Sequence, residues 1–120
     1  MHVNIKTTHV ELDPHMGTYL DEKLVVLEKY VDKEDESVKL DFEIEHLKKH
    51  KKGDVYKAEI NVLVGGKMVR AEAKGTTLQE VIDKVQDESA RNLRKLKKKR
   101  FSMLKRRGAK MKEMLRFRRR

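Results

Sequence analysis

The stretch RNLRKLKKKR, residues 91–100, places seven basic side chains and no acid within ten residues. Lys and Arg at this density attract polyanions, because their fields add along the surface. Residues 91–120 hold 16 Lys or Arg and one acid, which gives +15, whereas residues 1–90 hold 14 bases and 19 acids, which gives −5. The sequence therefore predicts a mildly acidic domain with a strongly basic end, and nucleic acid is the first candidate partner.

The cations of this stretch share a predicted helix with an apolar stripe. Side chains that recur every three or four residues form its inward face, namely Leu78, Val81, Ile82, Val85, Ser89, Leu93 and Leu96. At about 100° per residue, the separate outer face carries Lys84, Arg91, Arg94, Lys95 and Lys98. The helix dipole favours C-terminal cations by about 0.3–1 kcal/mol each, which accounts for one or two of them. We therefore interpret this face as a polyanion-binding surface rather than a merely solvated one.

Other reactive groups are few or poorly spaced for chemistry. The chain has no Cys, which removes disulfides, thiolate catalysis and Cys-based metal sites. His46 and His50 are four residues apart across a strand end, where their rings do not share a face. Gly65 and Gly66 join two predicted strands and precede no helix, so they form no phosphate cradle. We expect no catalytic residue, metal site, cofactor or small-molecule substrate, and hence no enzyme.

Hydrophobic periodicity predicts the elements that precede the basic helix. HVNIKTTHVEL, residues 2–12, is typical of a strand, and residues 12–31 form a helix with Asp13 as N-cap and Pro14 at its first position. After the acidic connection DKEDES, strict alternation in SVKLDFEIEHL, residues 37–47, indicates a half-buried strand. The first half of the chain is therefore strand, helix, strand.

Two more strands and the basic helix complete the pattern. KKHKKGD, residues 48–54, is interpreted as a solvated loop, with phosphate contact as the alternative. Residues 55–75 give two strands joined by a Gly-Gly hairpin turn, and Thr76 or Thr77 caps the following helix, with Glu80 in a capping box. The order βαβββα predicts an α+β two-layer sandwich. Its four-stranded sheet carries both helices on one face, a topology like that of double-stranded-RNA-binding domains.

The chain divides into one domain and a short basic end. We expect residues 1–100 to form the domain, with the last three strands antiparallel, and residues 101–120 to form a basic C-terminal tail. Gly108 interrupts that tail, and repulsion among its like charges opposes folding on its own. No apolar run approaches the roughly 18 residues of a membrane span, and the N-terminus lacks a signal-peptide stretch, so we expect a cytoplasmic protein without membrane contact.

The outward face of the sheet and the motifs of the sequence indicate the type of polyanion. Its outward face is predicted to be acidic, with Asp41, Glu43, Glu45, Glu59 and Glu72, which disfavours stacking of single-stranded bases there. We find neither a helix-turn-helix nor a basic zipper. Recognition of structured RNA through shape and phosphate contacts fits best.

Three segments resemble a known family in their order and spacing. MHVNIKTTHVELDPHMGTYLDEKLVVLEKYV, AEINVLVGGKMVRAEAKG and LQEVIDKVQDESARNLRKLKKK are similar to the bacterial hibernation-promoting factor and ribosome-associated inhibitor family, also called sigma-factor modulation proteins. The resemblance covers about residues 2–99. Its most specific parts are Pro14, LEKY at residues 27–30, and VID followed by RNLRKLKKK. The chain resembles the short members, without a second, dimerising domain.

The resemblance implies a function for the basic face. Such a domain docks on the small ribosomal subunit where tRNA and mRNA would lie, and it inhibits translation by occupancy under stress, without catalysing a reaction. By position, the rRNA-binding residues would be Lys23, Lys29, Lys84, Arg91, Arg94, Lys95, Lys98 and Lys99, and we add Arg100, which follows them. We expect a monomer off the ribosome.

Two alternatives stay open from the sequence. The domain could be a generic module for structured RNA, which competition with tRNA or mRNA would distinguish. It could instead be an adaptor whose Met-rich basic tail docks on an acidic protein or anionic membrane. Binding that is insensitive to nuclease would favour the adaptor.

Overall fold

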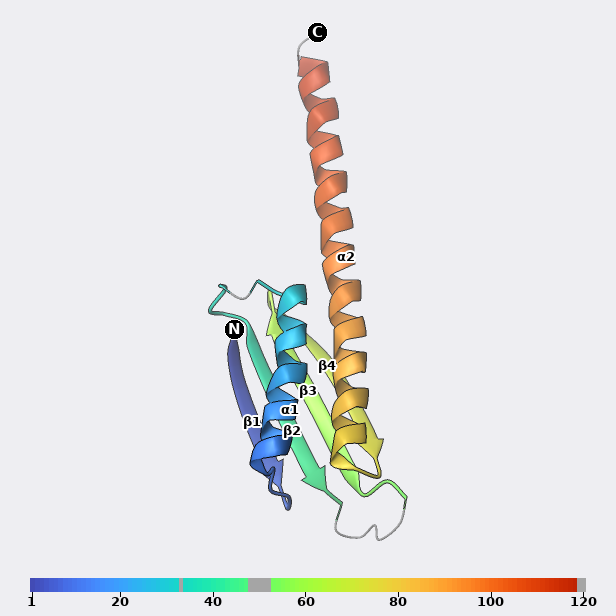
Figure 1. Ribbon diagram of the computed structural model, residues 1–120. Helices are drawn as coiled ribbons and strands as arrows, with labels where there is room; N and C mark the ends of the chain where they lie inside the picture. The colour runs from blue at the N-terminus through green and yellow to red at the C-terminus, as the bar shows by residue number, and fades with distance from the viewer. Residues whose placement is uncertain (33, 48–52, 119–120) are drawn as a thin grey trace.

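The computed structural model describes residues 1–32, 34–47 and 53–118, with side chains up to residue 109. Its elements follow the predicted order, with a short 3₁₀ helix, η1, after the first α-helix (Figure 1). They are β1 (His2–Thr8), α1 (Pro14–Val25), η1 (Val26–Tyr30), β2 (Lys39–His46), β3 (Tyr56–Val64), β4 (Lys67–Gly75) and α2 (Leu78–Arg118). The predicted loop at 48–52, and with it His50, lies outside the described residues.

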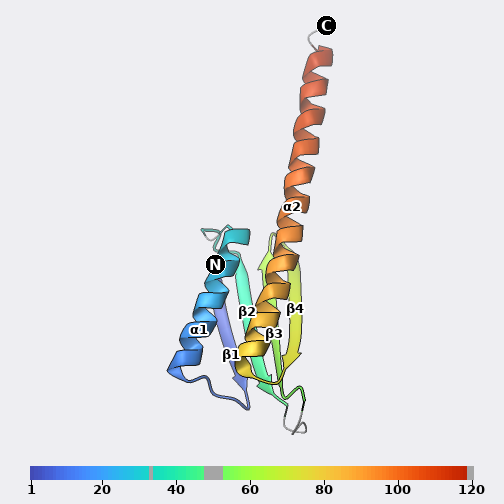
Figure 2. The same ribbon diagram turned by 45° about the vertical axis from the view of Figure 1, so that its right-hand side comes forward.

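The four strands form one sheet in the order β1-β2-β3-β4. β1 and β2 are parallel, because α1 and η1 cross back between them, whereas β2, β3 and β4 are joined as antiparallel neighbours. Both helices cover the same face of the sheet (Figure 2). The predicted α+β two-layer sandwich is therefore confirmed, as is the antiparallel pairing of the last three strands.

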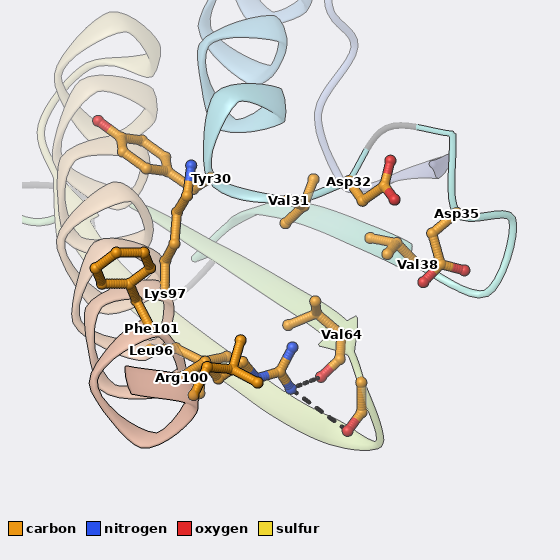
Figure 3. A pocket seen from close by; sticks show the side chains of 12 residues that line it. Tyr30, Val31, Asp32, Asp35, Val38, Val64, Leu96, Lys97, Arg100 and Phe101 are labelled. Carbon is orange, nitrogen blue, oxygen red and sulfur yellow. Dashed lines mark hydrogen bonds between the residues drawn. The ribbon is translucent and has the colours of Figure 1, made fainter. Parts of the chain in front are cut away.

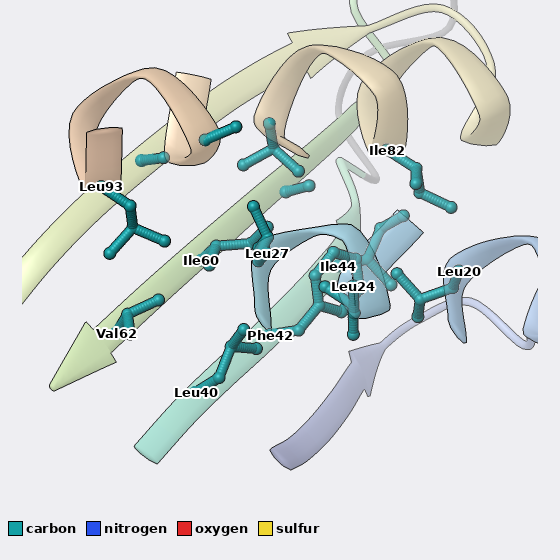
Figure 4. Packing of buried hydrophobic residues seen from close by; sticks show 14 of the residues in the cluster. Leu20, Leu24, Leu27, Leu40, Phe42, Ile44, Ile60, Val62, Ile82 and Leu93 are labelled. Carbon is teal, nitrogen blue, oxygen red and sulfur yellow. The ribbon is translucent and has the colours of Figure 1, made fainter. Parts of the chain in front are cut away.

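Period-two alternation directs one side of each strand toward the helices. On β2, Leu40, Phe42 and Ile44 are at most 1% exposed, and Ile60 and Val62 lie beside them on β3. Leu20, Leu24 and Leu27 from α1 and η1 meet Ile82 and Leu93 from α2 over these strands (Figure 4). The core is a thin aliphatic layer, as the low aromatic content requires.

The outward face of the sheet concentrates negative charge. Cross-strand register places Glu43, Glu59 and Glu72 side by side on β2, β3 and β4, with Lys6 of β1 at the end of the row. Adjacent like charges repel one another, so this face does not favour a phosphate backbone. Between the two faces of the sheet, the helical layer is therefore the better side for a polyanion.

Both helices begin at the predicted caps. The Asp13 carboxylate accepts a 2.7 Å hydrogen bond from the Met16 amide, ahead of Pro14. At the start of α2, the Thr77 hydroxyl accepts from the Glu80 amide at 3.1 Å. The Glu80 carboxylate accepts from the Thr76 amide and hydroxyl, at 3.1 and 2.7 Å. Thr77 is thus the N-cap, and the capping box closes on Thr76.

α2 continues to Arg118, where the sequence predicts a loose tail after Arg100. The prediction gave too much weight to charge repulsion, because like charges one turn apart cost only about 0.2–0.5 kcal/mol per pair. Gly108 costs about 1 kcal/mol, which weakens a helix without ending it, while the Lys, Arg, Leu and Met around it favour one. The last turns therefore project well beyond the sheet (Figure 1), and the molecule measures 74 × 26 × 19 Å. Within the described ranges, no helix is long and apolar enough to cross a membrane.

Candidate nucleic-acid interface

The orientation of α2 is set by its buried stripe. Val81, Ile82, Val85 and Leu93 are at most 1% exposed against the sheet, and Ser89 is fully buried among them. Two side chains on the flank of α2 also donate to backbone carbonyls along the edge of β4: Asn92 to Arg70 at 3.1 Å and Lys84 to Lys74 at 3.3 Å. The helix cannot rotate without losing these contacts, so its outer face is fixed.

Four cations occupy that outer face over two turns. Arg91, Arg94, Lys95 and Lys98 are all exposed, as the sequence periodicity predicts. Their side chains have no acidic partner or hydrogen-bond acceptor among the described residues, and the same holds for the neighbouring Lys99. We call Arg91, Arg94, Lys95 and Lys98 the basic face. Because their charges are not neutralised within the domain, they are available to phosphate groups.

Lys84 lies two turns earlier and is already engaged. Its ammonium group is 2.7 Å from the Glu80 carboxylate, and the hydrogen bond to Glu80 raises the pKa of Lys84. That bond and those from Thr76 lower the pKa of Glu80 to about 2. Nearby Asp83 and Asp87 further reduce the positive potential at this end of α2. The structure thus separates Lys84 from the basic face, although all five residues point outward.

The two predicted cations of the first helical segment differ in environment. Lys23 is half-buried, 3.4 Å from the Asp83 carboxylate and 5.5 Å from the centre of the Tyr19 ring. The Tyr19 hydroxyl also donates to Asp83, and this hydrogen bond raises the pKa of Tyr19. This cluster joins α1 to α2 and gives Lys23 a structural role. Lys29, on η1, is exposed, with its ammonium group 5.1 Å from the centre of the Tyr30 ring.

Lys97 is a further cation that the helical periodicity did not single out. Its ammonium group donates to the backbone carbonyl of Lys29 at 3.1 Å, which connects α2 to η1. Lys29 and Lys97 thereby meet at the junction of the two helical segments. Only the packing of η1 against α2 reveals this pair, because the two residues are 68 positions apart.

Arg100 differs from the rest of the predicted set. Its guanidinium donates to the carbonyls of Val64, at 2.9 Å, and Gly65, at 3.4 Å, on the β3-β4 hairpin (Figure 3). The sequence interpretation places Arg100 at the start of a free tail, whereas the structure uses it to hold the hairpin against α2. Some of the N–H donors of Arg100 are therefore already used in hydrogen bonds within the domain.

Potential metal ligands lie apart from one another in the described part of the chain. Among the side chains of residues 1–32, 34–47 and 53–109, no group of three or more metal-binding side chains comes together. The arrangement is a two-layer domain with a fixed row of cations on an outward helical face. Such a row binds phosphates by charge and position, without reading bases. The fold and this surface define the class: a small α+β domain with an exposed cationic face on its second helix.

The comparisons with known proteins agree with this class. The chain belongs to the Sigma 54 modulation protein / S30EA ribosomal protein family, whose model matches residues 3–100, and is thus a member of a ribosome-associated family. The resemblance noted from the sequence is confirmed. A search of curated proteins gives no match.

Two solved structures share the fold. The N-terminal domain of Protein Y from Thermus thermophilus has 21% sequence identity and a TM-score of 0.62, and the match covers 80% of this chain and 99% of that one. A ribosomal subunit interface protein from Coxiella burnetii has 16% identity and a TM-score of 0.63, with coverage of 81% and 98%. Each match covers about four fifths of this chain and nearly all of the other.

Proposed function

We propose that this protein binds the rRNA of the small ribosomal subunit in the path of tRNA and mRNA and blocks translation by occupying it. The observation that carries the proposal is the basic face: four exposed cations without acidic partners in the described chain, held outward by the burial of Leu93 and its neighbours. Family membership supports a ribosomal partner. The domain then acts as a hibernation or inhibition factor in the cytoplasm and needs no catalytic residue or cofactor.

The roles of the individual residues follow from their surroundings. Arg91, Arg94, Lys95 and Lys98 supply the main phosphate contacts, with Lys99 beside them and Lys29 at the η1 junction. The other predicted cations keep their internal contacts and add positive potential around the basic face; they are Lys23, Lys84 and Arg100. The acidic sheet face points to the opposite side, so the domain approaches RNA with its helical layer first.

Sedimentation with ribosomes tests the proposal directly. We expect the protein to pellet with small subunits at low salt and to be released as salt rises, because phosphate binding displaces condensed counterions. The variant Arg91→Glu with Lys95→Glu should abolish pelleting and leave the thermal unfolding midpoint nearly unchanged, since both side chains are exposed. The matched control, Lys39→Glu with Lys67→Glu, makes the same change of charge at exposed positions on the sheet and should still pellet.

Two outcomes would contradict this function. Equal loss in the control variant would mean that net charge alone governs binding. Failure of bound protein to compete with tRNA on the small subunit would leave only a generic structured-RNA module. A chemical footprint of the rRNA in the complex would then show where the domain rests.

A further inference from the structure

An apolar groove lies at the point where α2 leaves the sheet (Figure 3). Its volume is about 310 Å³. The domain supplies one wall through η1, the loop before β2 and the β3-β4 hairpin, and α2 supplies the other. The apolar side chains that line it are Val31, Val38, Val64, Leu96, Phe101 and Leu104.

The α2 wall of this groove exposes large apolar side chains. Phe101 is 62% exposed and Leu104 is 65% exposed, although both line the groove. The ammonium group of Lys105 is 5.7 Å from the centre of the Phe101 ring. Contiguous exposed apolar groups of this kind mark interaction sites in soluble proteins.

The apolar groups follow a regular spacing along the end of α2. Phe101, Leu104, Gly108, Met111 and Leu115 are separated alternately by three and four residues. This is the spacing with which one helix presents a seam to a second helix. By helical geometry this row is turned to one side of the inward stripe of α2, and its members Phe101 and Leu104 are exposed. We call Phe101, Leu104, Gly108, Met111 and Leu115 the seam.

The position of the seam selects the shape of its partner. Phe101 and Leu104 face the same groove as Val38 and Val64, so the seam begins in the inside corner between α2 and the end of the domain. A flat membrane surface cannot enter such a corner, because the hairpin and the loop before β2 stand in its way. A single helix, about 10–12 Å across, can lie along it.

Charge selects the chemistry of that helix. Residues 97–118 contain 11 Lys or Arg and one acid, Glu113. Two copies of this segment would repel each other along their full length, which disfavours self-association. At about 100° per residue, Lys105 and Arg107 flank the seam on its two sides, as interhelical ion-pairing positions do. An acidic helix with an apolar stripe therefore satisfies both the seam and its flanks.

The domain wall of the groove restricts the orientation of the partner. Asp32 and Asp35 stand on this wall, opposite Lys97 and Arg100 on the α2 wall. Acidic side chains of a docked helix must point toward α2, and those facing the loop before β2 must be neutral or basic. The groove thus has a polarity that RNA, which is uniformly anionic, does not match.

We propose that the seam and the adjoining groove form a docking site for an acidic amphipathic helix of a partner protein. The site does not depend on the proposed ribosomal function. By helical geometry, Arg91, Lys95 and Lys98 lie about 100° to 160° around the axis from the centre of the seam, and Arg94, the nearest member of the basic face, lies about 60° from it. One molecule can therefore hold RNA and a protein helix on different sides of α2.

Binding of a synthetic peptide tests this site with the full chain. The probe is a helix of about three heptads with Leu at the seam positions and mainly Glu elsewhere, and the comparison peptide has the same composition in scrambled order. At about 150 mM salt, where long-range attraction is screened, the striped peptide should bind at least about tenfold more tightly. Fluorescence anisotropy of labelled peptide measures both affinities.

Substitutions that keep the charge then locate the binding. Phe101→Gln with Leu104→Gln should weaken binding of the striped peptide by about tenfold or more, because two apolar side chains no longer enter the interface. Met103→Gln is the matched control. Met103 is 45% exposed on the same helix but lies off the seam, so its loss should leave the affinity unchanged. Circular dichroism confirms that each variant keeps its helix content.

Several results would overturn the site. If the scrambled peptide binds as tightly as the striped one, charge alone accounts for the binding and the seam contributes nothing. A dimer of the chain that dissociates in the Phe101→Gln, Leu104→Gln variant would make a second copy the occupant. Binding to anionic vesicles that the same variant abolishes would make it a membrane site. Loss of peptide binding with unchanged ribosome pelleting supports the site and separates it from the proposed function.

Discussion

At the scale of single residues, Glu80 connects the start of α2 to its surroundings. Its carboxylate accepts hydrogen bonds from Lys84 and from both groups of Thr76, and these bonds hold its pKa at about 2, against an ordinary value of 4.5. Because the pKa is lower in the folded protein, the ionised carboxylate stabilises the fold above pH 4.5. This stabilisation is lost as the pH falls from 4.5 toward 2.

A substitution at Glu80 should therefore have a pH-dependent effect. We expect Glu80→Gln to lower the urea midpoint at pH 7, because the pair with Lys84 is lost, and the difference from the parent should shrink between pH 4.5 and pH 2. Urea unfolding followed by circular dichroism across this range measures it. Glu22→Gln, at an exposed position of α1 without a partner in the described ranges, serves as the control. If the difference in urea midpoint between Glu80→Gln and the parent stays constant with pH, the lowered pKa of Glu80 is refuted.

Single residues also show where sequence reasoning ends. The outward direction of Arg91, Arg94, Lys95 and Lys98 follows from helical periodicity alone, and the structure confirms it. The internal roles of Lys97 and Arg100 could not be predicted, because they depend on backbone carbonyls 68 and 36 residues away. Spacing along one helix or strand predicts which way a side chain points. It does not predict which groups of another element the side chain contacts.

At the scale of elements, the β3-β4 hairpin and α2 support each other. Gly65 and Gly66 both have positive φ, of 56° and 77°, as a tight hairpin turn requires. A Cβ at Gly65 would lie 2.3 Å from the Arg100 guanidinium, whereas one at Gly66 meets nothing within 4 Å. Gly65 thus serves both the turn and the arginine that reaches it from α2.

This difference predicts unequal costs for the same substitution. Each of Gly65→Ala and Gly66→Ala should lose about 1–2 kcal/mol of unfolding free energy through backbone strain. Gly65→Ala should lose about 1 kcal/mol more, because the Arg100 hydrogen bonds are displaced. In an Arg100→Ala background the two costs should become equal. Denaturant titration of these four glycine variants, the parent and Arg100→Ala measures the costs, and a persistent gap in the Arg100→Ala background would show that Arg100 is not its cause.

The elements themselves were predictable to different degrees. Strict alternation made β2 a strand with a known inward face, and the Gly-Gly pair set the hairpin. The length of α2 was not predicted, because repulsion and intrinsic propensity act in opposition after Arg100 and the sequence alone did not weigh them correctly. The 3₁₀ turn η1 is a tertiary effect, since it brings Leu27 into the core at the end of α1.

At the scale of the whole molecule, charge is divided between two sides and one end. The sheet presents Glu43, Glu59 and Glu72 on one side, and the helical layer presents the basic face on the other. This separation orients the protein as it approaches a polyanion. The end of α2 lies outside both layers and carries its own apolar seam.

The core predicts that the domain folds without the end of α2. Its last fully packed member is Leu93, so a chain ending at Arg100 keeps the hydrophobic cluster and the Arg100 bonds to the hairpin. We expect its thermal midpoint to stay within about 2 °C of the full chain, which corresponds to well under 1 kcal/mol. Differential scanning calorimetry measures it. A fall of many degrees would mean that residues 101–120 belong to the folded unit.

The strand order has a consequence for how the protein is made. Because neighbours in the sheet are also neighbours in the chain, each new strand can pair with the one synthesised just before it. The connections between the antiparallel strands are short, and α1 and η1 fill the longer crossover from β1 to β2, which favours rapid, vectorial assembly. Leu93 must emerge from the ribosome that synthesises the chain before it can complete the core and fix the basic face outward. A nascent chain therefore gains its oriented cations last, after the sheet that directs them already exists.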